Sequence, residues 1–159
     1  MNSFQLKIIA CILMAIDHVG AIMFPDIDLY RIIGRLSFPI FAFLLTEGYV
    51  HTRNLKKYFI RLFIFAIIPQ IPYSLAFGID ILNIFFTLFF GMLAILVDDK
   101  INNVYKKWGL ILGIVVISEL LHMDYGYYGI IMIFLFKKSK DNWKNLVITL
   151  TLLNISIYP

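Results

Sequence analysis

Long apolar runs separated by short polar connectors dominate the pattern of this chain. Six runs are candidate membrane-spanning helices, at residues 5–24, 36–52, 59–77, 81–97, 108–122 and 125–137, and a seventh apolar run follows at 145–158. A helix needs about 20 apolar residues to cross the hydrocarbon core of a bilayer, and somewhat fewer where it is tilted or its ends are hydrated. The pattern therefore predicts an all-α, polytopic membrane protein with about six to seven transmembrane helices.

The composition agrees with this class. The chain has 159 residues, of which 61% are hydrophobic and only 15% are charged, and its mean hydropathy is +0.86. A soluble domain carries about a quarter charged residues. The one cysteine, Cys11, excludes an intramolecular disulfide and leaves no thiolate cluster for a metal. We expect contact with membrane lipid, no nucleic-acid partner and no metal.

Lysine and arginine fall almost entirely on one side of the predicted spans. Twelve of the fourteen lie near the N-terminus or near connectors after even-numbered spans, and only Arg31 and Arg35 lie on the other side. Cytosolic loops are enriched in these residues. We therefore expect a cytosolic N-terminus and a multi-pass protein.

An Asp-His pair, Asp17 and His18, lies inside the first predicted span. Ionisable side chains are expensive at membrane depth, so the pair is a functional-site hypothesis. His18 follows Lys7 by eleven residues, which is about 16 Å along a helix and nearly the same helix face. Adjacent helical residues point about 100° apart, so Asp17 either orients His18 or pairs with Arg35.

Four blocks, in this order, resemble the TraX family of membrane proteins. They are Lys7 and His18 in the first span, GRLSFPIFAFLLTEGYVHTRNLKKYFIRLFIFAIIPQIPYS at 34–74, NIFFTLFFGML at 83–93 and DYGYYG at 124–129. The family is named for a protein that acetylates the pilin N-terminus in conjugative plasmids. It is similar to the acyltransferase-3 superfamily, whose members take acetyl groups from cytosolic acetyl-CoA and place them on acceptors at or beyond the membrane.

The resemblance implies a membrane-bound O- or N-acetyltransferase of the bacterial cytoplasmic (inner) membrane. Its donor would be acetyl-CoA, and its acceptor a pilin or peptide amine or an envelope glycan. Longer members of the family run on for further spans, so we expect residues 1–159 to form a single transmembrane domain that lacks those C-terminal spans. The superfamily motif more often begins with arginine, where this chain has Lys7.

Acetyl transfer requires a general base near the acceptor proton and cations for the phosphates of the coenzyme. His18 is the candidate base and Asp17 its catalytic partner. The candidate coenzyme-binding residues are the basic side chains of the predicted cytosolic face, Lys7, Arg53, Lys56, Lys57 and Arg61. Positive-inside topology and lipid phosphates alone would also produce this basic run.

Polar side chains near the ends of the spans are candidate contacts for the acceptor. We select Arg35, Glu47, Asn83, Glu119, Asp124 and Tyr125. Several also have a structural interpretation. Glu47 can form a salt bridge with Arg53 or bond His51, Asn83 can be a packing position between helices, and Asp124 can belong to a tight turn.

Two other classes of function stay open at this point. In a small membrane transporter or channel component, the intramembrane Asp, His and Arg would form a proton or substrate pathway, although no inverted repeat is visible. In a non-catalytic assembly subunit of an envelope or conjugation machine, the buried Asp17–His18 pair would have no role.

Overall fold

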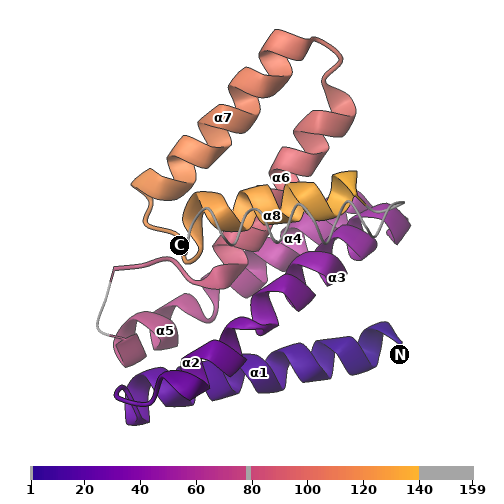
Figure 1. Ribbon diagram of the computed structural model, residues 1–159. Coiled ribbons are helices and arrows are strands. Elements are labelled where there is room, and N and C mark those ends of the chain that lie inside the picture. Colours follow the sequence, from indigo (N-terminus) through magenta and orange to yellow (C-terminus); the bar gives the residue numbers. More distant parts are fainter. Residues whose placement is uncertain (1, 78–79, 140–159) are drawn as a thin grey trace.

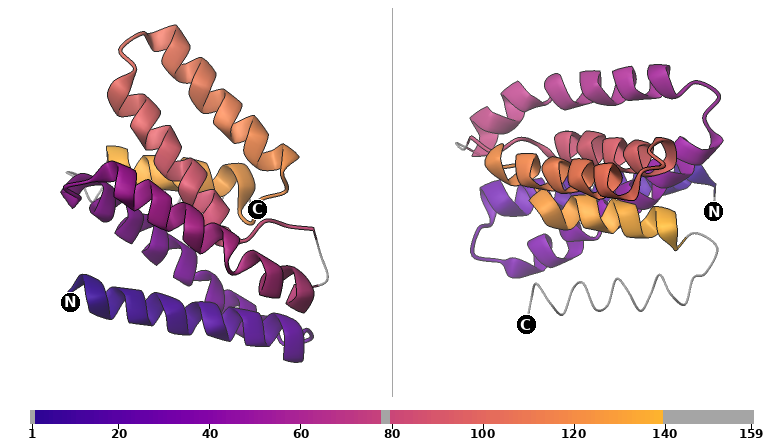
Figure 2. Two further views of the ribbon diagram at one scale, coloured as in Figure 1. Left: turned by 180° about the vertical axis from the view of Figure 1, so that it is seen from behind. Right: turned by 90° about the horizontal axis from the view of Figure 1, so that it is seen from above.

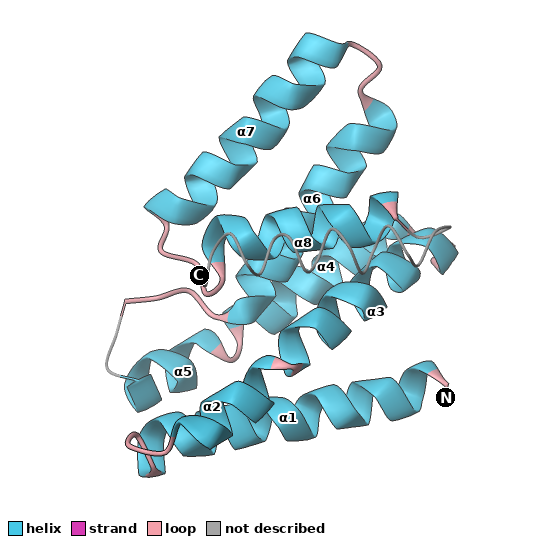
Figure 3. Cartoon of the chain, in the orientation of Figure 1, coloured by secondary structure: helices cyan, strands magenta, loops and turns pink. Residues whose placement is uncertain are grey.

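The structure, a computed structural model, describes residues 2–77 and 80–139, and every regular element in these ranges is a helix (Figures 1 and 3). The helices are α1 Ser3–Met23, α2 Asp28–Arg35, α3 Ser37–His51, α4 Leu55–Ile67, α5 Gln70–Phe77, α6 Ile84–Lys100, α7 Val104–Leu120 and α8 Gly126–Lys138. The predicted all-α class is confirmed.

Three helical segments are long and apolar enough to cross a membrane. They are α1 itself, the segment Asp28–His51 formed by α2 and α3, and the segment Leu55–Phe77 formed by α4 and α5. The chain is therefore a membrane protein. Helices α6 and α7 have 17 residues each and α8 has 13, so the larger number of spans stays a prediction. The apolar run at 145–158 lies outside the described residues.

The connector expected between the first two spans is mostly helix. Residues 28–35 form α2, which begins at Asp28 and ends at Arg35. An acidic residue in the first turn and a basic residue in the last turn both stabilise a helix through its dipole. Asp28 and Arg35, whose charges are typical of a polar connector, thus lie at the two ends where they stabilise a short helix.

The second difference concerns the run 59–77, which is broken into α4 and α5 near Pro69. Proline lacks the backbone N–H that a continuous helix requires. At the start of α5, the side-chain amide of Gln70 donates to the backbone carbonyl of Ile81 at 3.0 Å. This hydrogen bond connects the start of α5 to the chain just before α6.

Helix α6 lies at the centre of the bundle, packed against α3, α4, α7 and α8. The buried side chains of α3, α6 and α8 form the core, which includes Phe38, Ala42, Leu45, Leu88, Met92, Ile95, Met132 and Ile133. A Cβ atom at Gly91 would overlap Ile133, so glycine lets α6 and α8 approach closely. Figures 1 and 2 show α1 beside α2 and α3 on one side and α7 on the opposite side.

The outer surface is apolar. Large hydrophobic side chains such as Phe4, Ile71, Leu75 and Leu120 are 68–80% exposed. A surface of this kind suits lipid rather than water, because monomeric soluble proteins rarely expose large contiguous apolar patches.

The two ends of the bundle differ in their connections. At one end Asp98 pairs with Lys107 at 3.1 Å and with Lys138 at 2.6 Å, which ties α6 to α7 and α8. At the other end Leu82 donates its backbone N–H to His122 and accepts from the N–H of Asp124. The second set of contacts holds the connectors before α6 and α8 together.

Candidate functional site

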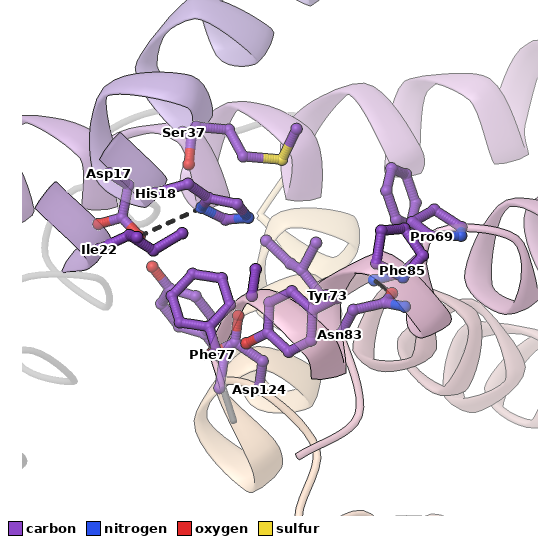
Figure 4. Close-up of a pocket in the computed structure, with 15 residues that line it drawn as sticks. Asp17, His18, Ile22, Ser37, Pro69, Tyr73, Phe77, Asn83, Phe85 and Asp124 are labelled. Atoms are coloured by element: carbon purple, nitrogen blue, oxygen red, sulfur yellow. Dashed lines mark hydrogen bonds and ion pairs between the residues drawn. The ribbon is translucent and has the colours of Figure 1, made fainter. Parts of the chain in front are cut away.

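A cavity of about 290 Å³ opens between α1, α5, the start of α6 and the connector before α8 (Figure 4). It is lined by five residues that the sequence nominated, Asp17, His18, Asn83, Asp124 and Tyr125. They come from segments far apart along the chain. The cavity is therefore a product of tertiary packing, and its polar groups face a mostly apolar wall.

Close packing of α2 on α1 sets the position of Asp17. A Cβ atom at Gly34 would overlap the Asp17 backbone, and one at Gly20 would overlap Tyr30. Glycine at both positions lets the two backbones approach. Arg31, one turn before Gly34, then reaches the carboxylate, and its Nη1 lies 2.6 Å from Asp17 Oδ2. Asp17 is thus paired with Arg31.

The imidazole of His18 faces two aromatic rings of α5. Its ring centroid lies 5.1 Å from that of Phe77, in an edge-to-face arrangement, and 6.0 Å from that of Tyr73. Figure 4 shows Tyr73 and Phe77 on the opposite wall of the cavity from His18. Aromatic pairs in such geometries restrict the orientation of the ring.

Two polar atoms of this pair remain unsatisfied. Asp17 Oδ1 and His18 Nδ1 are the buried side-chain N and O atoms that find no hydrogen-bond partner within residues 2–77 and 80–139. His18 Nδ1 lies 3.7 Å from Asp17 Oδ2, too far for a hydrogen bond. Unsatisfied buried groups are rare in folded proteins, and a catalytic role, strain or an ordered water or ion each explains such a group.

The connector before α8 carries the acidic side of the cavity. Burial, together with the charge of Asp17, raises the pKa of Asp124 to about 6, against opposing effects of His18 and Arg31. The next residue, Tyr125, adopts φ +63° and stacks on Phe38 at 4.1 Å between ring centroids. This left-handed residue turns the chain sharply, so that Asp124 faces the cavity as α8 begins.

Asn83 lines the cavity, but its polar atoms are bonded within the protein. Its Nδ2 donates to the carbonyl of Ala66 and to Gln70 Oε1, both at 2.8 Å, and its Oδ1 accepts from the N–H of Phe85. Asn83 therefore caps α6 and joins it to the break between α4 and α5. Its role as a substrate contact stays a prediction.

Glu119, like Asn83, accepts a hydrogen bond from a backbone N–H at the start of a helix. Its Oε1 accepts from the backbone N–H of Tyr127 at 2.7 Å, in the first turn of α8. A carboxylate at a helix N-terminus satisfies a donor that has no partner inside the helix. Glu119 does not line this cavity.

A second and larger cavity, of about 680 Å³, lies at the other end of α1. Its lining includes Lys7, Cys11, His51, Tyr58 and Arg61. Two of the predicted coenzyme-binding residues, Lys7 and Arg61, are thus brought to one cavity. The guanidinium of Arg61 lies 6.0 Å from the centroid of the Tyr58 ring, within cation–π range.

The other three basic residues of the predicted coenzyme site are outside this lining. Arg53, Lys56 and Lys57 are exposed, and none of them lines the second cavity. Asn54 caps α4 by accepting from the Lys57 N–H at 2.9 Å, so Lys56 and Lys57 belong to the first turn of that helix. These three residues are thus not part of the cavity lining that Lys7 and Arg61 share, and their role in coenzyme binding stays a prediction.

Arg35 and Glu47 also lie outside the 290 Å³ cavity. Arg35 lines a third cavity, of about 520 Å³, together with Arg31 and Asp28. Glu47 Oε2 lies 3.5 Å from His51 Nδ1, one turn further along α3. The contact between Glu47 and His51 matches the structural interpretation of Glu47 that the sequence offered.

Sequence reasoning missed the residues that complete the cavity around His18. These are Ser37, which is buried, together with Tyr73 and Phe77 of α5. The sequence did contain one signal for them. Two prolines, Pro69 and Pro72, precede Tyr73 in an otherwise apolar run and indicate a break in the helix at this point. Within the described residues no group of three or more His, Cys, Asp or Glu side chains is arranged to hold a metal ion.

Comparison with known proteins identifies the family. The sequence model of the family described as "TraX protein" matches residues 3–158. The chain belongs to the TraX family. The expected resemblance is therefore confirmed over nearly the whole length.

Two relatives of this TraX-family chain are informative. One is "Probable fimbrial assembly protein FimC, serogroup H1" of Dichelobacter nodosus, 34% identical over 146 residues, which cover 82% of this chain and 59% of the relative. The other is "Uncharacterized protein RP591" of Rickettsia prowazekii (strain Madrid E), 38% identical over 72 residues, which cover 45% of this chain and 27% of the relative. The match thus covers less than two thirds of either relative. No solved structure matches the chain.

Proposed function

We propose that this TraX-family chain transfers an acetyl group from acetyl-CoA to an acceptor at or beyond the membrane, with His18 as the general base. The observation that carries the proposal is the cavity that gathers Asp17, His18 and Asp124 and leaves His18 Nδ1 unsatisfied. Titratable groups that converge on one cavity from distant segments are typical of an active site.

The chemistry follows from these groups. His18, as neutral imidazole, takes the proton of the acceptor amine or hydroxyl as that atom attacks the thioester carbonyl. A new bond forms between the acceptor and the acetyl carbon, the carbon–sulfur bond breaks, and the imidazolium returns the proton to the coenzyme thiolate. The Arg31–Asp17 ion pair beside His18 stabilises the transient positive charge through the carboxylate.

The donor is assigned to the second cavity. Lys7 and Arg61 provide cations in a partly enclosed space, which suits the phosphates of a nucleotide coenzyme. Cytosolic acetyl-CoA requires this end of the bundle to face the cytosol.

The proposed topology is about six to seven transmembrane helices with a cytosolic N-terminus in the bacterial inner membrane. The basic residues of the connectors after even-numbered spans support it, as does the position of Lys107 and Lys138 at one end of the bundle. In intact cells, an Asn103→Cys variant with Cys11→Ser is expected to resist a membrane-impermeant thiol reagent. Ready labelling at position 103 would contradict the orientation.

The acceptor is proposed to be a pilin or another envelope component. The name of the Dichelobacter relative, a probable fimbrial assembly protein, supports this choice. Asp124 lies where a carboxylate would meet a cationic amine, which favours an amino group on the acceptor.

Replacement of His18 tests the proposal. A His18→Ala protein is expected to lose acetyl transfer by about 10²- to 10⁴-fold while it still binds acetyl-CoA. A His122→Asn variant serves as the matched control, because His122 is exposed and lines none of the three cavities. Near-full transfer by His18→Ala would overturn the catalytic role.

The second candidate is a non-catalytic subunit of a pilus assembly machine, and the name of the Dichelobacter relative favours it equally. A His18→Ala variant expressed in cells separates the two. If it restores pilus assembly in a strain lacking the natural chain, an assembly role is sufficient and the catalytic proposal fails. A transporter or channel component is a third candidate, and coenzyme-dependent label transfer by the purified protein would separate the acetyltransferase from both alternatives.

A further inference from the structure

The cavity around His18 and the larger cavity around Lys7 meet at two residues. Met14 of α1 and Phe85 of α6 line both cavities. On α1 the residues Lys7, Cys11, Met14 and His18 follow one another at helical spacings of four, three and four, so they share one face. That face runs from one cavity to the other, with Met14 between them.

The two residues differ in how firmly they are held. Phe85 lies in the first turn of α6, where its N–H donates to the cap Asn83 at 3.0 Å. Its ring centroid lies 6.5 Å from that of Phe41 and 6.2 Å from that of Phe65. Met14 has an unbranched side chain with three rotatable bonds, which adapts easily to a changing space. Phe85 is thus the fixed side of the constriction and Met14 the adaptable side.

The charges on the two sides of the constriction are opposite. Lys7 and Arg61 line the larger cavity, whereas Asp17 and Asp124 line the smaller one. A polyanionic nucleotide is attracted by the first pair, whereas among the described residues no lysine or arginine lines the smaller cavity and Asp17 there is already paired with Arg31. A slender, uncharged thioester arm needs no such cation, and an apolar constriction excludes water and ions more readily than it excludes the arm.

We propose that Met14 and Phe85 form an apolar gate between the two cavities, through which the acyl-thioester arm of the donor passes toward His18 while the nucleotide stays beside Lys7 and Arg61. This inference rests on the proposed function. Met14 and Phe85 are positioning residues, because they guide the donor and take no part in the proton transfer.

The chain offers a thiol on the near side of the gate and a site for one on the far side. Cys11 lines the larger cavity and Ser37 lines the smaller one. In a Ser37→Cys protein, chloroacetyl-CoA can alkylate either thiol. The thiolate attacks the chloroacetyl carbon, a carbon–sulfur bond forms, chloride leaves, and the thiol proton passes to the buffer. Peptide mass spectrometry then locates each adduct.

Blocking the gate is expected to separate the two adducts. With Met14 in place, chloroacetyl-CoA should label Cys11 and the thiol at position 37. With Met14→Trp added, the adduct at Cys11 should remain and the adduct at position 37 should be lost. Ile12→Trp is the matched control, since Ile12 lies on the same helix, is 55% exposed and lines neither cavity. It should leave both adducts unchanged.

Two comparisons make the outcome decisive. Iodoacetamide, a small reagent without a nucleotide, should reach position 37 equally with Met14 or Trp at position 14, which shows that the smaller cavity is still open. Persistent labelling of position 37 by chloroacetyl-CoA in the Met14→Trp protein would overturn the gate but leave the proposed function standing. If chloroacetyl-CoA labels Cys11 no faster than chloroacetamide does, the coenzyme site itself is wrong, and the gate falls with it.

Discussion

Arg31 Nη1 lies 2.6 Å from Asp17 Oδ2, whereas the Nδ1 atom of the neighbouring His18 lies 3.7 Å from the same oxygen. The carboxylate of α1 is therefore neutralised by a cation of α2. Because Asp17 is only 16% exposed, it is strongly dependent on this partner. The pair also fixes the charge beside His18, so it links the packing of α1 and α2 to the chemistry of the cavity.

Removing Arg31 should leave Asp17 unpaired. Arg31→Met is expected to lower the free energy of unfolding by about 1–3 kcal/mol, which is the usual cost of an unsatisfied buried polar group. Unfolding in detergent by heat, followed by circular dichroism, measures the loss. The double variant Arg31→Met, Asp17→Asn should recover part of it, because no charge is left unpaired. A double variant less stable than Arg31→Met alone would argue against the pairing.

The close contact between Gly34 and Asp17 should tolerate no side chain. Gly34→Ala places a methyl group against the Asp17 backbone and is expected to cost about 1–3 kcal/mol of stability through overpacking. Gly113→Ala in α7 is the matched control, since no atom lies within 4 Å of its Cβ position in the described structure. Alanine there should stabilise the helix by up to about 1 kcal/mol. Equal effects of the two substitutions would refute the proposed close approach of α2 to α1.

The stability of the protein should depend on the ionisation of Asp124. Burial raises its pKa to about 6, and the groups that influence it across the cavity are Asp17, His18 and Arg31. A carboxyl with a raised pKa binds its proton more tightly in the folded state. The stability that this proton confers is therefore present at low pH and is lost as the pH rises through about 6.

Asp124→Asn should remove this pH dependence. Midpoints of thermal unfolding for the natural protein and for Asp124→Asn, measured between pH 4 and 8, should diverge as the pH rises. The amide variant is expected to be the more stable of the two at about pH 8. Parallel curves would show that Asp124 titrates at its ordinary pKa, and the buried carboxyl would then have no role as an acid–base group near neutral pH.

The two sets of basic residues should differ in their contribution to donor binding. Lys7→Gln with Arg61→Gln removes both cations of the larger cavity, and is expected to weaken acetyl-CoA binding at least about tenfold, since a hydrogen bond to a charged group contributes about 1.5–3 kcal/mol. Lys56→Gln with Lys57→Gln changes the net charge equally, but at exposed positions outside that cavity. Isothermal titration at two salt concentrations measures both pairs.

Solvent-exposed charges act over long distances and are screened by salt. Any effect of Lys56→Gln with Lys57→Gln should therefore disappear at high ionic strength, while the effect of Lys7→Gln with Arg61→Gln should persist. If both double variants lose the same acetyl-CoA affinity at high salt, the basic residues have no specific role in binding the coenzyme. Positive-inside topology alone then explains them.

The sequence by itself determined the class of the protein and the face of α1 that carries the site. Apolar runs and the scarcity of charge require helices in a lipid environment, because hydrocarbon cannot satisfy an open backbone. The shared face of Lys7 and His18 depends only on the spacing of residues along one helix, and both residues do line cavities on α1. Local periodicity is sufficient for conclusions of this kind.

Tertiary structure alone decided which side chains meet. Helical spacing left Asp17 with several possible partners, and the close approach at Gly34 selected Arg31. Glu119 and Asp124 flank the same turn, yet the fold uses Glu119 to cap α8 and turns Asp124 toward His18. Such choices depend on the angles at which helices cross and on the path of connectors, to which residues far apart in the sequence contribute jointly, so local spacing carries no record of them.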